Sequence, residues 1–218
     1  MKKAKGKSGK ELKKKHNLCN LKPLINSYSN NPTFHYSIIP LFHYSIIPLF
    51  QHSTNPLPMN LKFRTTPQES DIKSVREIIE STKFFYDSEV EIAVDLVKER
   101  LEFGESTGYF FVFAEADGVT VAYSCFGPIL MSDTSFDLYW ICTNNDYRGK
   151  GIGKKLMEQT ENYAREMGCK ILIAETSGLP HYEPTRAFYI KTNFDLEAKL
   201  KDFYKMGDDK LFYTKRIG

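Results

Sequence analysis

The sequence predicts an α/β fold with a mixed central sheet of about seven strands, flanked by about four helices. The main observation is an aromatic and β-branched strand at 136–143, a glycine-rich turn, a helix at 151–167 and an apolar strand at 171–176. Such a crossover leaves its two strands parallel. A second observation is the turn dipeptide Asp117-Gly118 between two apolar segments, which predicts an antiparallel hairpin. Parallel and antiparallel pairs together indicate a mixed sheet.

The elements before the crossover follow from periodicity and from turn residues. A short strand is expected at 61–65, and strands at 109–116 and 119–126 form the hairpin. Two helices lie between the first strand and the hairpin, each with apolar residues on one face. We expect capping boxes to open both helices, with Thr66 and Ser88 as the N-caps and Pro67 at the first position of the first helix.

The elements after the crossover begin with Gly168, which supplies a left-handed end for the helix at 151–167. A last helix is expected at 184–192, and Asn193 tolerates the left-handed conformation at its end. Strands at 195–205 and 210–217 then surround a turn at 207–209.

Residues 1–58 differ in composition from the rest of the chain. The first 20 residues are rich in lysine, and the octamer at 34–41 recurs unchanged at 42–49. Two copies of an octamer cannot bury a core, and the composition is typical of disorder. We therefore expect a basic, repeat-containing, disordered extension at 1–58 and a folded domain at 59–218. The extension could come from a start codon chosen too far upstream, or it could be an interaction arm.

Charge and cysteine usage narrow the class of protein. The net charge of +3 combines +7 in residues 1–20, +1 in 21–58 and −5 in 59–218. A basic tail on an acidic domain can touch nucleic acid or an anionic membrane, although such runs are usually only solvated. The four cysteines show no metal-binding or C-x-x-C spacing, and no apolar run is long enough to span a bilayer. We expect a cytoplasmic protein with reduced thiols, no metal and no membrane span.

The turn at 146–154 is the most informative stretch. Its three glycines lack a Cβ atom, so a ligand can approach the backbone. It also opens a helix, whose first N–H groups favour a phosphate. The dinucleotide fingerprint fails because Lys154 stands where glycine is needed, and the P-loop fails because Lys155 stands where Ser or Thr is needed.

What remains is Arg148-x-x-Gly151-x-Gly153 at the start of a long helix, which resembles the acyl-coenzyme A loop of the GNAT superfamily of N-acetyltransferases. The resemblance covers residues 59–218, whose element order matches, and it implies the GNAT-like acyl-CoA N-acyltransferase fold. It also implies that the backbone of Cys142 and Thr143, where the sheet splays, pairs with the pantetheine arm. The cofactor-binding residues expected in the loop are Arg148, Gly149, Lys150, Gly151, Ile152, Gly153 and Lys154.

Three residues are candidates for acid–base catalysis. An amine acceptor must lose a proton, and Asp137 and Glu175 are the carboxylates that could face the cleft, although each is equally typical of an exposed strand end. The segment 188–194 resembles the family's F-Y-x-K-x-G-F, which implies that Tyr189 is the general acid. Two residues depart from the family pattern: Asn193 replaces its last glycine, and Tyr182 replaces an asparagine that contacts the cofactor.

The resemblance implies an N-acetyltransferase that transfers an acetyl group from acetyl-CoA to a primary amine by direct attack. The acceptor stays open between a small-molecule amine and a protein amine, and a homodimer stays open as well. A non-catalytic acyl-CoA-binding or sensing module is the alternative, and it would need neither Tyr189 nor a carboxylate. A third reading is an interaction protein whose basic arm binds nucleic acid.

Overall fold

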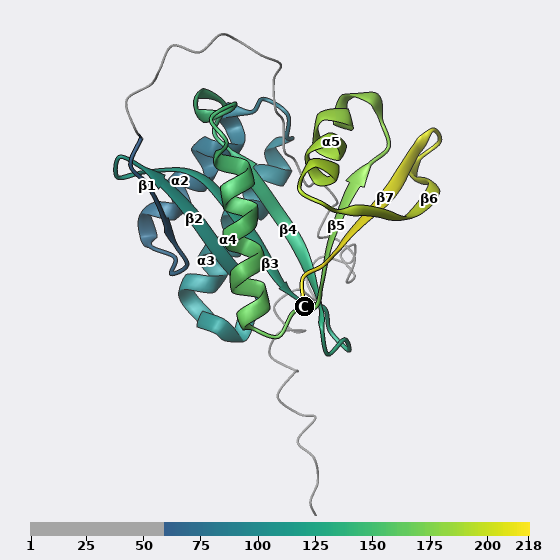
Figure 1. Ribbon diagram of the computed structural model, residues 1–218. Coiled ribbons are helices and arrows are strands. Elements are labelled where there is room, and N and C mark those ends of the chain that lie inside the picture. Colours follow the sequence, from purple (N-terminus) through teal and green to yellow (C-terminus); the bar gives the residue numbers. More distant parts are fainter. Residues whose placement is uncertain (1–58) are drawn as a thin grey trace, which may run out of the picture. The chain divides into compact units, whose positions relative to one another are not determined.

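The computed structural model describes residues 59–218, and the predictions for 1–58 lie outside the described residues. The described part contains one seven-stranded sheet and four α-helices, as predicted. In the sheet the strands follow the order β1-β2-β3-β4-β5-β7-β6 (Figure 1). The strands are β1 (Leu61–Arg64), β2 (Phe110–Ala116), β3 (Val119–Pro128), β4 (Ser135–Thr143), β5 (Ile171–Ser177), β6 (Asp195–Lys205) and β7 (Asp208–Arg216). The helices are α2 (Glu69–Ser81), α3 (Asp87–Phe103), α4 (Ile152–Glu166) and α5 (Glu183–Lys191).

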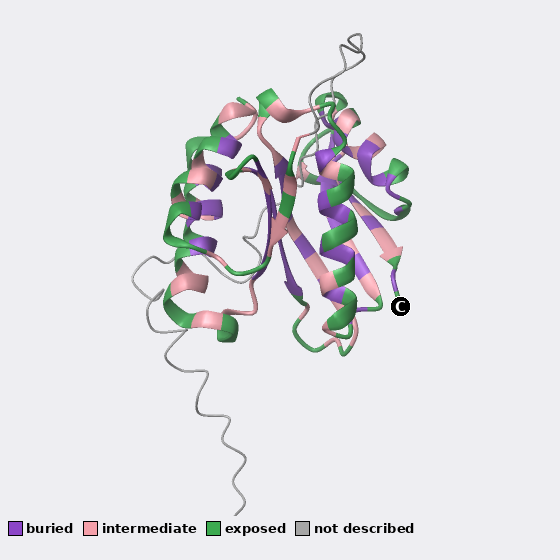
Figure 2. Ribbon diagram, turned by 60° about the vertical axis from the view of Figure 1, so that its left-hand side comes forward, coloured by how far each residue is buried: buried purple, intermediate pink, exposed green. Residues whose placement is uncertain are grey.

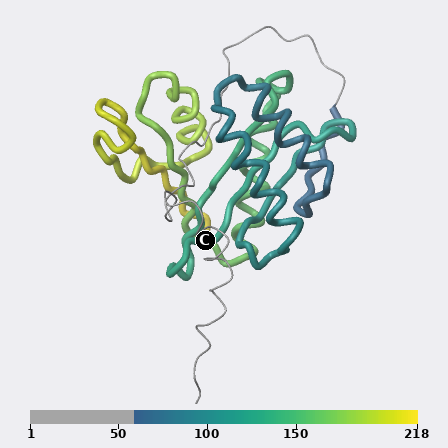
Figure 3. The backbone as a smooth tube through the Cα atoms, turned by 180° about the vertical axis from the view of Figure 1, so that it is seen from behind, coloured from purple at the N-terminus to yellow at the C-terminus, as the bar shows by residue number. Residues whose placement is uncertain are grey.

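The sheet separates two apolar layers. Helices α2 and α3 cover one face of the sheet, and they pack on Phe111, Phe113 and Trp140. This face is turned toward the reader in Figure 3. Helices α4 and α5 cover the other face, where Leu156 and Phe188 pack on strand residues such as Leu138. Figure 2 shows the buried stripe of each helix turned toward the sheet and its exposed residues turned away. This arrangement follows from the apolar stripes of the helices.

Strands β4 and β5 are parallel, as the crossover predicts, but they stay together only briefly. They pair at three positions, from Ser135 opposite Ile171 to Asp137 opposite Ile173. Beyond Asp137 they diverge, while β5 goes on pairing with β7 up to Ser177 (Figure 1). Backbone groups of β4 beyond Asp137 therefore face a neighbouring strand that has turned away.

The two predicted capping boxes are wrong in position. Helix α2 begins at Glu69, and the carboxylate of Asp71 accepts a 2.7 Å hydrogen bond from the Gln68 N–H. Asp71 is fully buried and is also bound by Arg64, so this carboxylate rather than the Thr66 hydroxyl marks the start of the helix. In the same way α3 begins one residue before Ser88, and Glu89 accepts from the Tyr86 N–H at 2.8 Å.

The left-handed helix ends predicted at Gly168 and Asn193 are confirmed, with φ 91° and 65°. The predicted hairpin turn is confirmed as well, and its Asp117 and Gly118 have φ 51° and 86°. Most boundaries move by one or two residues; among them, β7 begins at Asp208 instead of Lys210, because Asp208 already pairs with Lys205 across a tighter turn. Within residues 59–218, no helix has both the length and the apolarity that crossing a bilayer requires.

Candidate active site

The loop between β4 and α4 leaves its backbone accessible at two glycines. Gly149 and Gly151 have φ 75° and 77°, in the left-handed region that favours glycine. A Cβ atom built at either position would meet no heavy atom within 4 Å. Helix α4 begins directly afterwards at Ile152, and the N–H groups of its first turn have no partner within the helix. Glycine is therefore needed here for the backbone conformation, and open space remains beside it.

A pocket of about 250 Å³ opens beside this loop. It contains seven of the nine predicted cofactor-binding residues. The lining residues are Thr143, Tyr147, Arg148, Gly149, Gly151, Ile152, Gly153, Lys154, Phe188, Lys191 and Thr192. Arg148 is half-buried, and burial lowers the pKa of its guanidinium, yet no carboxylate pairs with it among the described residues. A half-buried cation without a carboxylate, next to a helix N-terminus, fits the phosphate groups of a coenzyme A.

The two predicted cofactor residues outside the pocket lining have other surroundings. Lys150 places its ammonium 4.7 Å from the ring centre of Tyr147, which does line the pocket. The side chain of Cys142 is buried on the α2–α3 side of the sheet, and burial raises the pKa of this thiol to about 12. Such a thiol is not a nucleophile at neutral pH, so only the backbone of Cys142 is available for a ligand.

Helix α5 and its C-cap supply a pocket wall that sequence reasoning missed, through Phe188 and Lys191 in the helix and Thr192 after it. A Cβ atom at Gly153 would lie 3.5 Å from Cε2 of Phe188 and 3.7 Å from Oγ1 of Thr143. Gly153 therefore lets the start of α4 pack closely against α5 and β4. Lys191 belongs to the motif that pointed to Tyr189, so its position in that motif was the available signal.

Two of the three predicted catalytic residues lie on one face of the sheet. Asp137 and Glu175 both face the α2–α3 side, at and just past the last paired position of β4 and β5. Burial, together with the charge of Glu175, raises the pKa of Asp137 to about 6, although Lys210 opposes this rise. Glu175 forms an ion pair with Lys210, which sequence reasoning also missed because the pair depends on the register of β5 and β7.

Tyr189 belongs to α5, on the opposite face of the sheet, and is fully buried. Its ring centre lies 5.5 Å from those of both Phe194 and Tyr213. Burial raises the pKa of its phenol well above the usual value, so the hydroxyl keeps its proton at neutral pH. The predicted acid and the two carboxylates are thus on opposite sides of the diverging strands.

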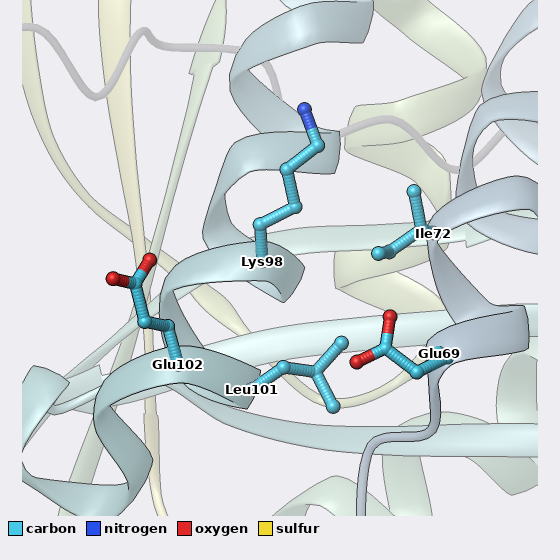
Figure 4. A pocket seen from close by; sticks show the side chains of 5 residues that line it. All are labelled: Glu69, Ile72, Lys98, Leu101 and Glu102. Carbon is cyan, nitrogen blue, oxygen red and sulfur yellow. The ribbon is translucent and has the colours of Figure 1, made fainter.

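Another hollow lies between α2 and α3, with Ile72 and Leu101 facing one another across it (Figure 4). Charged side chains surround this small apolar contact, and no residue of β4, β5 or the glycine loop takes part. Its lining residues are Glu69, Ile72, Lys98, Leu101 and Glu102. We assign no function to it.

Comparison with known proteins bears on the fold and the family of this chain. An amino-acid acetyltransferase of Azotobacter vinelandii is 36% identical over 78 residues, which are 36% of this chain and 18% of the relative. The chain thus spans about a fifth of that relative's length. A crystal structure from Desulfovibrio desulfuricans, assigned to the GNAT family, is 39% identical with a TM-score of 0.71, covering 72% of this chain and 99% of that one.

A Salmonella typhimurium structure solved with its cofactor acetyl-CoA shares the fold, with a TM-score of 0.57 at 17% identity, covering 73% of this chain and 95% of that one. The family model described as "Acetyltransferase (GNAT) family" matches residues 72–194, more than half of the chain. This chain belongs to the GNAT family of acetyltransferases.

Proposed function

We propose that this enzyme acetylates a primary amine by direct attack, with Asp137 as the general base. The observation that carries the proposal is Asp137 itself. It is a half-buried carboxylate with a pKa of about 6, at the last position where β4 and β5 are paired. A general base works best when its pKa lies near the working pH, because it is then mostly ionised and still accepts a proton.

The donor's phosphates would be held by Arg148, Lys154 and Lys191, together with the N–H groups at the start of α4. The backbone of Cys142 and Thr143 lies on the diverging part of β4, where an amide-bearing chain can pair as an added strand would. When bound, the donor supplies an acetyl thioester. These residues bind and orient it, and the proton transfers belong to other groups.

Two protons must move. A lysine-like ammonium has a pKa near ~10.4 and an α-ammonium one near ~8, so the acceptor must be deprotonated before it attacks. Asp137 would accept this proton on the α2–α3 side of the sheet. Tyr189 would donate to the departing sulfur from the α5 side, because its buried phenol keeps its proton at neutral pH. The position of the two groups on opposite faces supports separate roles.

The observations support an amine as the acceptor and no narrower chemical class. Amino acids are the first class to test, since the Azotobacter vinelandii relative is an amino-acid acetyltransferase. Peptides with free α-amines form the second class. The carboxylate of Asp137 on the α2–α3 side favours an acceptor that arrives as a cation, whereas Glu175 is already paired with Lys210.

The test is release of free thiol when the full chain is incubated with acetyl-CoA and panels of amino acids, diamines and peptides. We expect activity to rise with pH through about 6, as Asp137 loses its proton. Asp137→Asn should lower kcat about 10²-fold or more. The matched control is Asp133→Asn in the exposed turn before β4, which should change nothing. Acetyl-CoA binding without thiol release from any amine would instead favour the non-catalytic binding module.

Stability separates a lost base from a misfolded variant. The folded state raises the pKa of Asp137 above its ordinary value of 3.8, so its ionised form is disfavoured by folding. The resulting loss of stability is absent at pH values below the pKa of Asp137 in the unfolded chain. It is complete at pH values above its pKa in the folded protein. Asp137→Asn should therefore be at least as stable as the wild type at pH 8, by thermal melting.

A further inference from the structure

Three charged side chains form a diagonal row on the α2–α3 face of the sheet, where the acceptor is proposed to bind. Asp137 on β4 pairs with Ile173, two residues before Glu175 on β5. Glu175 pairs with Phe212, two residues after Lys210 on β7. Because alternate residues of a strand share a face, all three side chains lie on the α2–α3 side, with Glu175 on the middle strand.

Lys210 is held firmly in this row. Its ammonium contacts the Glu175 carboxylate and lies 4.6 Å and 4.9 Å from the ring centres of Phe203 and Phe212. Only 9% of Lys210 is exposed. An ammonium enclosed by one carboxylate and two aromatic faces is well compensated, and the carboxylate depends equally on the ammonium.

The groups that act on Asp137 can be named from each neighbouring strand. Glu175 on β5 is the nearby negative charge, and Lys210 on β7 is the positive one. Tyr139 on β4 also faces Asp137, and burial keeps it neutral. Tyr204 on β6, likewise neutral, faces Glu175. The charge felt by Asp137 is therefore set largely by whether Glu175 is compensated.

We propose that Lys210 is a positioning residue for the acid–base chemistry: by pairing with Glu175 it offsets that negative charge and keeps Asp137 able to ionise at neutral pH. The inference rests on the proposed function, in which Asp137 is the base. It assigns Glu175 to tuning Asp137 rather than to accepting the proton, and it makes the ion pair across β5 and β7 part of the active site.

The direction of each substitution follows from the charges. Lys210→Met leaves Glu175 uncompensated and removes a positive charge, so ionisation of Asp137 should need a pH higher by about one unit. Glu175→Gln removes the negative neighbour and should lower that pH. The double variant Lys210→Met/Glu175→Gln should return close to the wild type. Lys210→Arg keeps the positive charge and should leave the midpoint, the pH at which Asp137 is half ionised, where it was.

Two measurements on the full-length chain follow the midpoint: carbon-13 NMR titration of the Asp137 carboxyl, and the acid limb of kcat/KM. Lys215→Met is the matched control. It breaks another ion pair of β7, with Glu161 at 2.6 Å, but that pair lies on the α4 side. It should lower thermal stability without moving the midpoint. If Lys210→Met does not fold, the midpoints of the double variant and of Lys210→Arg are compared with the wild type instead.

A folded Lys210→Met protein with an unmoved midpoint in both measurements would overturn the inference. So would a double variant that stays as far from the wild type as Lys210→Met. Failure of the proposed function looks different. It would appear in the wild type as no thiol release, or as full activity of Asp137→Asn, and the latter would also end the role of Lys210 in catalysis even if the NMR midpoint moved.

Discussion

The hydroxyl of Tyr189 belongs to a ring that is packed inside the α5 side of the sheet, against Phe194 and Tyr213. Two roles are compatible with this position, a core aromatic and a proton donor to the departing sulfur. Helix α5 brings Phe188 to the cofactor pocket one residue earlier, so Tyr189 lies next to a pocket wall. Its role depends on the hydroxyl, and its packing depends on the ring.

Tyr189→Phe separates these roles because it removes the hydroxyl and keeps the ring. We expect kcat to fall about 10²-fold, the low end of general-acid effects, since a thiolate is already a tolerable leaving group. Acetyl-CoA affinity, measured by calorimetry, should stay unchanged. Tyr213→Phe, in the same cluster, is the control and should keep its kcat. An unaltered kcat for Tyr189→Phe would make Tyr189 a packing residue, and a large fall in Tm would make its hydroxyl structural.

At the scale of an element, the turn into α4 tests whether open backbone or basic charge holds the donor. Gly151→Ala places a methyl group in the space beside the loop, where no protein atom lies within 4 Å. It also forces alanine into a left-handed conformation, which costs about 1–2 kcal/mol. The strain affects folding, whereas the methyl group affects only what approaches the loop.

Gly118→Ala in the β2–β3 hairpin is a matched control, because Gly118 also has a left-handed φ, 86°, and no atom near its missing Cβ. Both variants should lose similar stability in denaturant unfolding. Only Gly151→Ala should weaken acetyl-CoA binding, by about tenfold or more in calorimetry, since a lost contact to a charged group is worth ~1.5–3 kcal/mol. Equal affinities for the two variants would contradict the loop assignment.

The sequence predicted those elements whose signals are local. Gly168, Asn193 and the Asp117-Gly118 turn were placed correctly because left-handed positions depend on the residues themselves. The start of α2 was misplaced, because Arg64 on β1 binds Asp71 and this contact joins residues whose side chains meet only in the fold. The same reason hid the pairing of Lys210 with Glu175, which depends on strand register.

The site residues also divide into those with local sequence signals and those whose properties depend on the fold. The loop glycines and Arg148 are contiguous in sequence and line one pocket. Asp137 could be named as a carboxylate on the central strand, but its raised pKa could not, since the cause is burial and a neighbouring strand. A sequence pattern reports which groups are available. Their electrostatic environment comes from tertiary packing.

At the scale of the whole molecule, the described residues 59–218 hold two apolar clusters, one on each face of the sheet. Met59, Leu61 and Phe63 pack against the cluster on the α4 side, so the first described residues already contribute to the core. Strand β1 adds four paired positions with β2 and the Arg64–Asp71 ion pair.

A shortened chain that begins at Met59 should therefore match the full chain in Tm and in acetyl-CoA affinity, which would support an extension at 1–58 that the catalytic domain does not need. The control is a chain that begins at Thr65 and lacks β1. It leaves the fully buried Asp71 without Arg64, and breaking a buried ion pair destabilises by about 3–5 kcal/mol, so its Tm should fall sharply or it should not fold. Scanning calorimetry of the three chains decides the matter. A chain from Met59 that melts well below the full chain would show that residues 1–58 stabilise the domain.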